Sequence, residues 1–227
     1  MPESDGFALE LDHVTVFTSM AAPEAQTLEA LGLRGFGGTT RHGNLGTAST
    51  SFFFQNTYLE LFWADDAKLV ERNLTPIGID VPARMNWRET GDSPFGLALR
   101  RRAGVTGPLP FSNQPLVADW MPAGTILEMS GEHTAEPYYA VIPPVLAFPA
   151  FKANLPEPNH PLGVQTLTGV SLTVVRTELS PTARLLSGVG LVAFETGMAP
   201  IMMLTFDGGA QGLTFDVRPT LPVVLNV

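Results

Sequence analysis

Apolar and polar residues alternate along residues 8–18, ALELDHVTVFT. This alternation and the β-branched residues predict a strand. One face of the predicted strand carries Leu9, Leu11, His13, Thr15 and Phe17, and the other carries Val14 and Val16.

The next elements form a short mixed unit with this strand. Residues 22–31 predict a helix, because Pro23 suits a first helical turn and Gly32 suits a left-handed cap. Three strands are then predicted, at 33–38, 50–55 and 58–63, and a Gly-Gly turn ends the first of them. The order is strand, helix, strand, strand, strand.

The middle of the chain is less regular. A short helix is predicted at 67–73 and a strand at 94–101. Eleven of the 20 prolines lie from Pro108 to Pro161, which disfavours long helices and central strands. Short strands are still predicted at 125–129 and 138–142, and aromatic residues persist throughout. We therefore expect an ordered, packed connection.

Regular patterning returns at residue 166. A strand at 167–175 and a helix at 180–186 are followed by strands at 191–195, 200–207 and 212–217. The order again is strand, helix, strand, strand, strand.

This internal repeat is the main organisational signal in the sequence. It predicts an α+β fold with an N-terminal βαβββ module (1–65), a proline-rich packed connection with extra strands (66–165) and a C-terminal βαβββ module (166–227). The two modules are expected to pair their curved sheets about a pseudo-twofold axis, around a cup-shaped pocket, in one compact structural unit.

Composition narrows the function classes. The chain has 227 residues, of which 44% are hydrophobic and 15% charged, and its formal net charge is −9. An acidic chain is a poor partner for nucleic acids and for anionic membranes. No cysteine is present, so disulfides and thiolate sites are excluded. We see no signal peptide and no apolar run of the ~20 residues that a membrane span needs, and expect a cytoplasmic protein.

Four short motifs carry a family resemblance. They are LDHVTVF at 11–17, GGTTRHGNLGT at 37–47, YLEL at 58–61 and HPLG at 160–163. In this order and spacing they resemble the glyoxalase-like domain family of the vicinal-oxygen-chelate superfamily, which also includes extradiol dioxygenases and bleomycin-resistance proteins. Ser49 and Leu162 stand where that family usually has asparagine.

The resemblance implies metal ligands on the first and fourth strands of each module. The N-terminal module offers His13 and Glu60, which would suit Fe(II), Mn(II), Ni(II) or Zn(II). In the C-terminal module Gly169 replaces the histidine, and Thr214, with Asp216 nearby, replaces the glutamate.

The histidines leave alternatives open. His42 or His160 is a candidate third ligand, whereas without a metal His13 would be a hydrogen-bonded core histidine paired with Glu60. His42 is a candidate acid–base group, because imidazole titrates near neutral pH, or else an exposed turn residue. His160 is a candidate substrate contact.

Aromatic residues flank the glutamate on the fourth predicted strand. Tyr58 and Phe62 share a face with Glu60, so we predict that both contact substrate, as does His42, and that Glu60 and His42 are catalytic. The alternative for the aromatic rings, Phe62 above all, is simple core packing. The function predicted is a glyoxalase-like small-molecule enzyme of lyase, isomerase or dioxygenase type, with or without a divalent metal. The alternatives are a metal-free binding protein of the bleomycin-resistance type and a structural or regulatory domain. Either a monomer or a homodimer is compatible with two modules in one chain.

Overall fold

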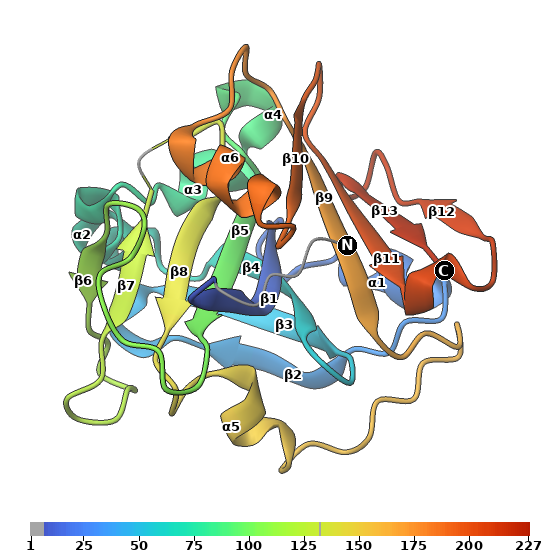
Figure 1. The fold of residues 1–227 in the computed structure, drawn as a ribbon, viewed down its shortest axis with the longest axis horizontal. Helices are drawn as coiled ribbons and strands as arrows, with labels where there is room; N and C mark the ends of the chain where they lie inside the picture. The colour runs from blue at the N-terminus through green and yellow to red at the C-terminus, as the bar shows by residue number, and fades with distance from the viewer. Residues whose placement is uncertain (1–6, 132) are drawn as a thin grey trace.

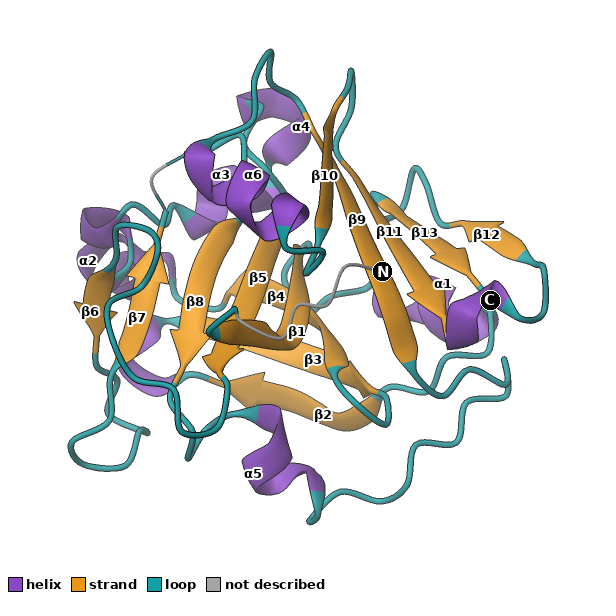
Figure 2. Cartoon of the chain, viewed as in Figure 1, coloured by secondary structure: helices purple, strands orange, loops and turns teal. Residues whose placement is uncertain are grey.

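A computed structural model describes residues 7–131 and 133–227 as an α+β fold with two sheets (Figures 1 and 2). The larger sheet contains β1 (Leu9–Phe17), β2 (Phe36–Arg41), β3 (Thr47–Phe53), β4 (Tyr58–Ala64), β5 (Phe95–Arg101), β6 (Gln114–Leu116), β7 (Leu127–Ser130) and β8 (Tyr138–Ile142). The smaller one contains β9 (Leu167–Val174), β10 (Ala193–Thr196), β11 (Ile201–Phe206), β12 (Thr214–Asp216) and β13 (Val223–Asn226).

The helices are short. They are α1 (Ala25–Ala30), α2 (Ala67–Asn73), α3 (Val81–Met85), α4 (Trp87–Thr90), α5 (Phe148–Lys152) and α6 (Pro181–Gly188), with 3-10 turns η1 (Gly43–Leu45), η2 (Thr75–Ile77) and η3 (Asp207–Gly209). In the described part of the chain, none is both long and apolar enough to cross a bilayer.

The eight-stranded sheet has two halves in which the strands pair in the same way. Its order is β2-β3-β4-β1-β5-β8-β7-β6, with β1 parallel to β4, β5 parallel to β8, and β1 antiparallel to β5 at the centre. The second half therefore comes from the proline-rich segment. Prolines are tolerated in the proline-rich segment because they lie in the connections, apart from Pro115 in the edge strand β6 and Pro149 in the first turn of α5.

Residues 166–227 form a sheet of their own, in the order β10-β9-β11-β13-β12. The predicted succession of strand, helix and three strands is found here, with β13 added after it. The expected pairing of this segment with residues 1–65 around one pocket is not observed. The partner of the first half is the segment containing β5–β8, whose strands continue the hydrogen-bond ladder of β1.

Two β-bulges make the observed strands β1 and β2 differ from the predicted ones. The register of β1 on β5 shifts between Leu11 and His13, so Asp12 is an extra residue that places these two side chains on opposite faces. The alternation predicted that Leu9 and Leu11 share the face of His13. This prediction is wrong, because the bulge places both leucines on the opposite face. In β2 the glycines lie inside the strand, where the register on β3 shifts between Phe36 and Thr40, and do not end it.

The two sheets share one apolar core. It joins the strand faces that carry Val14, Leu61 and Trp63 to Leu172 and Leu204 of the smaller sheet. Leu28 of α1 and Leu186 of α6 belong to the same cluster. The smaller sheet thus covers one face of the larger sheet and leaves the other face available for a cavity.

A buried carboxylate connects the two sheets. Glu136, in the loop before β8, is fully buried and accepts hydrogen bonds from the Ser180 backbone nitrogen at 2.7 Å and from its hydroxyl at 2.5 Å. Ser180 in turn caps α6 by accepting from the Ala183 nitrogen. Arg176 approaches the same carboxylate at 3.5 Å.

We predict that Glu136→Ala lowers the free energy of unfolding by about 2–4 kcal/mol, because it leaves buried donors of Ser180 unpaired. The matched control is Glu195→Ala, which removes an exposed carboxylate bonded to Thr173 and should cost under about 0.5 kcal/mol. Urea denaturation followed by circular dichroism measures both. Equal midpoints for the two variants would contradict the structural role of Glu136.

Candidate functional site

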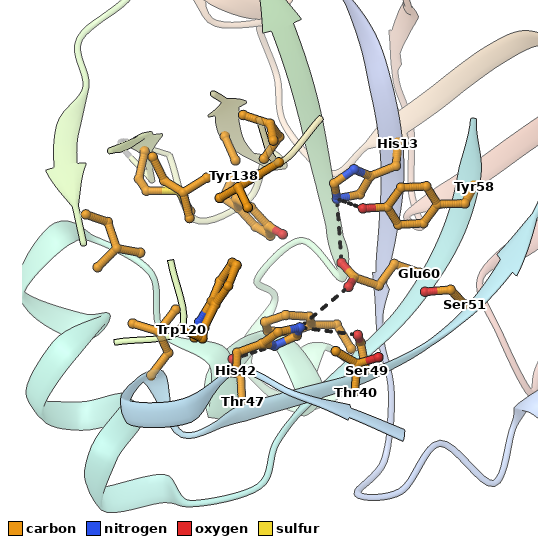
Figure 3. A pocket seen from close by; sticks show the side chains of 18 of the residues that line it. His13, Thr40, His42, Thr47, Ser49, Ser51, Tyr58, Glu60, Trp120 and Tyr138 are labelled. Carbon is orange, nitrogen blue, oxygen red and sulfur yellow. Dashed lines mark hydrogen bonds and ion pairs between the residues drawn. The ribbon is translucent and has the colours of Figure 1, made fainter. Parts of the chain in front are cut away.

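The uncovered face of the larger sheet encloses a cavity of about 480 Å³. Its lining comes from every strand of that sheet except β5, from η1 and α5, and from segments beside α2, η2 and α5. On β5, Gly96 leaves room for Tyr138, since a Cβ at Gly96 would lie 2.2 Å from the tyrosine ring. The ring of Tyr138 therefore covers the centre of the sheet and forms part of the wall (Figure 3).

The sheet curls until its two edges meet. Next to β2, the Asn44 nitrogen donates to Asp119 Oδ1, and beyond β6 the Asp119 nitrogen donates to Asn44 Oδ1, each at 3.2 Å. His42 and Trp120 also approach across this gap, with ring centroids 6.1 Å apart. Gly43 permits the contact, because its φ is +49° and a Cβ there would lie 2.1 Å from Asp119 Oδ1.

Glu60 on β4 is the central polar group of the cavity (Figure 3). Its Oε2 accepts a hydrogen bond from the Thr15 hydroxyl at 3.3 Å and lies 3.7 Å from His13 Nε2. Its Oε1 lies 4.0 Å from His42 Nε2. The parallel register of β1 on β4 sets Thr15 opposite Glu60, which fixes this cluster in the sheet. The carboxylate is thus held between two imidazoles.

Behind His13 lies a second carboxylate. His13 Nδ1 is 2.8 Å from Asp12 Oδ1, and Asp12 also bonds Arg100 at 3.2 Å and the Phe148 backbone nitrogen at 2.9 Å. The Asp12 carbonyl, displaced from the ladder by the bulge, accepts from the Thr57 hydroxyl at 2.6 Å. The Asp12 carboxylate favours a proton on His13 Nδ1. The Nε2 atom, which faces Glu60, can then accept a hydrogen bond or take up a second proton.

Opposing effects set the pKa of Asp12. Burial raises it, but the hydrogen bond and charge of His13, the Phe148 N–H and the Arg100 charge together hold this pKa below its ordinary value. Asp12 is therefore ionised at neutral pH and can accept a hydrogen bond from His13 Nδ1.

His42 follows β2 and is oriented by hydroxyl groups. Its Nδ1 lies 3.0 Å from Thr47 Oγ1 and its Nε2 lies 3.5 Å from Ser49 Oγ. The ring stacks on Phe62 with a centroid distance of 5.3 Å. Burial lowers the pKa of His42, although the charge of Glu60 opposes this effect, so the ring is neutral near pH 7.

Tyr58 is held against His13. Their rings stack with centroids 4.1 Å apart, and the Tyr58 hydroxyl lies 3.4 Å from His13 Nε2. Burial, with the charge of Glu60, places the pKa of Tyr58 well above its ordinary value. The phenol therefore remains a hydrogen-bond donor at neutral pH.

The structure brings together most of the predicted site residues. The cavity lining includes His13, His42, Tyr58, Glu60 and Phe62.

His160 lies outside this lining. Its Nδ1 accepts from the Arg34 backbone nitrogen and its Nε2 bonds the Phe53 carbonyl, each at 2.9 Å, so both ring nitrogens serve the backbone. Gly169, Thr214 and Asp216 lie in the smaller sheet, and Asp216 pairs with Arg218. These residues do not join the cluster around Glu60.

A metal in a catalytic site is usually held by at least three protein ligands. The two imidazoles approach different oxygens of Glu60. Opposite His13 on β5 stands Ala98, whose neighbour on β8 is Ala140, and neither side chain can ligate. Within residues 7–131 and 133–227, no three His, Asp or Glu side chains are grouped to hold a metal.

Sequence reasoning missed four residues of the site: Asp12, Thr15, Trp120 and Tyr138. Asp12 had a usable signal, because aspartate is depleted inside strands and here stands in an otherwise β-rich run. The other three had none, since hydroxyl and aromatic residues are ordinary in strands and loops.

Comparisons with known proteins place the fold alone. No protein-family model matches the chain, and no curated protein matches it. Among solved structures, it is similar to a crystal structure of a hypothetical protein from Staphylococcus aureus, with a TM-score of 0.51 and 8% identity over 96% of this chain and 99% of that one. The likeness therefore extends over both sheets.

We predict that Gly43→Ala separates the edges of the curled sheet, because Asp119 must move away from the new Cβ and lose its bonds to Asn44. Gly38→Ala is the matched control, since Gly38 also has a positive φ (+75°) but a Cβ added there would have nothing within 4 Å. In both variants backbone strain should lower the free energy of unfolding by about 1–2 kcal/mol. In Gly43→Ala the lost hydrogen bonds should lower it by about 1 kcal/mol more. Urea denaturation followed by circular dichroism measures the difference, and equal losses would contradict the proposed link.

We predict that Asp12→Asn loses about 1–3 kcal/mol of stability near neutral pH, because it removes charge-assisted bonds to His13 and Arg100. The folded pKa of Asp12 lies below the ordinary 3.8, so its contribution is present above that pH and is lost as the pH falls through the folded pKa. The deficit of the variant should therefore shrink in acid. Glu10→Gln, which also loses a bond to Arg100 but at a more exposed site, should cost under about 1 kcal/mol. A pH-independent deficit in Asp12→Asn would contradict this account.

Proposed function

We propose that this chain is a small-molecule enzyme of the vicinal-oxygen-chelate type in which Glu60 transfers a proton at carbon. The resemblance of the sequence motifs to the glyoxalase-like family supports the assignment. So does the sheet, in which two halves pair their first strands antiparallel and enclose the cavity on one face. In this proposal the βαβββ unit of residues 1–65 is joined by a shorter unit made of β5–β8.

The observation that carries the proposal is the placement of Glu60. A carboxylate with little exposure, in a largely apolar cavity and flanked by two imidazole Nε2 atoms, is a typical arrangement for a general base. A structural ion pair would need no cavity beside it. Here the carboxylate, both imidazoles and two tyrosine rings border the same open volume.

The proposed step is proton abstraction next to a carbonyl. Glu60 takes the proton of the C–H bond, and the electron pair moves to the carbonyl oxygen to give an enolate. Tyr58, which stays protonated, can donate a hydrogen bond to that oxygen. The proton then returns to a neighbouring carbon or oxygen, which gives an isomerisation, or a leaving group departs, which gives a lyase reaction. His13, with Asp12 behind it, can hold a proton beside Glu60 during the cycle.

Deuterium exchange tests this step without the natural substrate. We predict that the protein accelerates the incorporation of deuterium at the α-carbon of 2-hydroxyacetophenone in D₂O, as followed by proton NMR. Glu60→Gln should lower the protein-dependent rate by about 10²–10⁴-fold. Glu128→Gln is the matched control, since that carboxylate pairs with Arg101 away from the cavity, and it should retain the rate. Exchange that persists in Glu60→Gln would contradict the proposed role.

A metal-free binding protein of the bleomycin-resistance type is the second candidate. It is favoured by the alanines at positions 98 and 140, which supply no polar group in the second half of the sheet. This candidate predicts that aromatic molecules bind in the cavity while the wild type leaves the exchange rate at that of buffer.

A further inference from the structure

We propose that the cavity selects uncharged, elongated molecules with a carbonyl or hydroxyl group at one end and an apolar, preferably aromatic, body. The polar end would lie at Glu60 and the apolar body against β7 and β8. This inference rests on the proposed function for the direction of the polar end, and it adds the class of substrate that the site accepts.

The two walls of the cavity differ in chemistry (Figure 3). The wall built by β1–β4 carries the imidazoles, the Glu60 carboxylate and hydroxyl groups, together with the rings of Phe17, Phe53 and Phe62. Its hydroxyl groups include those of Thr40, Thr47, Ser49 and Ser51. The opposite wall is apolar, and its side chains include Leu116, Leu127, Met129, Ala140, Ile142 and Leu146. A bound molecule therefore gains most when its polar and apolar parts are segregated in the same way.

Aromatic rings from both walls border the cavity. Phe17 and Phe62 belong to β1 and β4, Trp120 to the loop after β6, and Tyr138 to β8. Phe17 meets Phe62 and Tyr138 edge to face, with centroids 5.6 and 5.7 Å apart. Ring edges and faces presented in this way favour contact with another aromatic ring.

Charge sets the second restriction. Among the described residues that line the cavity, the sole arginine or lysine is Arg41, whose side chain is 68% exposed at the rim and paired with Asp65 at 2.9 Å. Arg100 is engaged by Asp12 and Glu10 on the far side of His13. A carboxylate or phosphate on the ligand would thus lose its hydration without gaining a buried arginine or lysine as partner, and would also meet Glu60.

Two matched probes test the charge restriction. Isothermal titration calorimetry near neutral pH should show that 2-naphthol binds. 2-Naphthoate, which has the same ring system, should bind with an affinity lower by a factor of about ten or more. Equal affinity for the two probes, or no binding of 2-naphthol, would overturn the proposal.

A variant tests the orientation. Ala140→Leu fills space on the apolar wall, so it should weaken 2-naphthol about tenfold. The same variant should change the affinity for phenol, which needs only the polar end, less than about threefold, and this result also shows that the variant is folded. Unchanged 2-naphthol binding in Ala140→Leu would place the body elsewhere and overturn the orientation.

These outcomes are separable from those of the proposed function. If the protein prefers 2-naphthol but shows no Glu60-dependent exchange, the proposed ligand class is supported and the proposed enzyme activity is contradicted. Glu60-dependent exchange together with tight binding of 2-naphthoate would support the enzyme and contradict the ligand class.

Discussion

The backbone of β1 contains one residue more than its partner β5 between Leu11 and His13, and much of the molecule is arranged around this bulge. Before it, Leu9 and Leu11 face the core that the two sheets share; after it, Val14 and Val16 do so, while His13 and Phe17 face the cavity. Without the extra residue, one strand could not place apolar side chains in the core along its whole length and an imidazole in the cavity. Thr57 bonds the displaced carbonyl of Asp12, so the bulge leaves no buried acceptor unpaired.

The bulge also separates two carboxylates that lie near one histidine. Asp12 is buried behind His13 and surrounded by donors, among them Arg100 and the Phe148 nitrogen. Glu60 stands in front of it, with the open cavity beside it. The buried charge of Asp12 is held in place by these donors, whereas Glu60 keeps an unobstructed side for a ligand. This difference in environment, more than the presence of either acid, makes Glu60 the candidate base.

The smaller sheet repeats the pairing rule of the larger one on a reduced scale. β9 is parallel to β10, β11 is parallel to β13, and β9 and β11 pair antiparallel at the centre. In the larger sheet the outer strands continue far enough for the two edges to meet at Asn44 and Asp119. The smaller sheet has five strands, and one of its faces contributes to the shared core. Its contribution to the site is therefore to support the sheet that holds the cavity.

Local patterns in the sequence determined the α+β class, most strands of residues 8–63, the α2 helix and the grouping of Tyr58, Glu60 and Phe62, because alternation, caps and turn residues act over a few neighbouring positions. Only the tertiary structure decided which segment completes the sheet of β1, that His160 serves the backbone and that Asp12 stands behind His13. Strand partners are chosen by long-range hydrogen bonds and by burial against the second sheet. Neither partner can be identified from the strand's own residues, because apolar alternation shows that a face is buried but not which segment covers it. A proline-rich segment whose pattern predicts a connection could therefore supply half of the site.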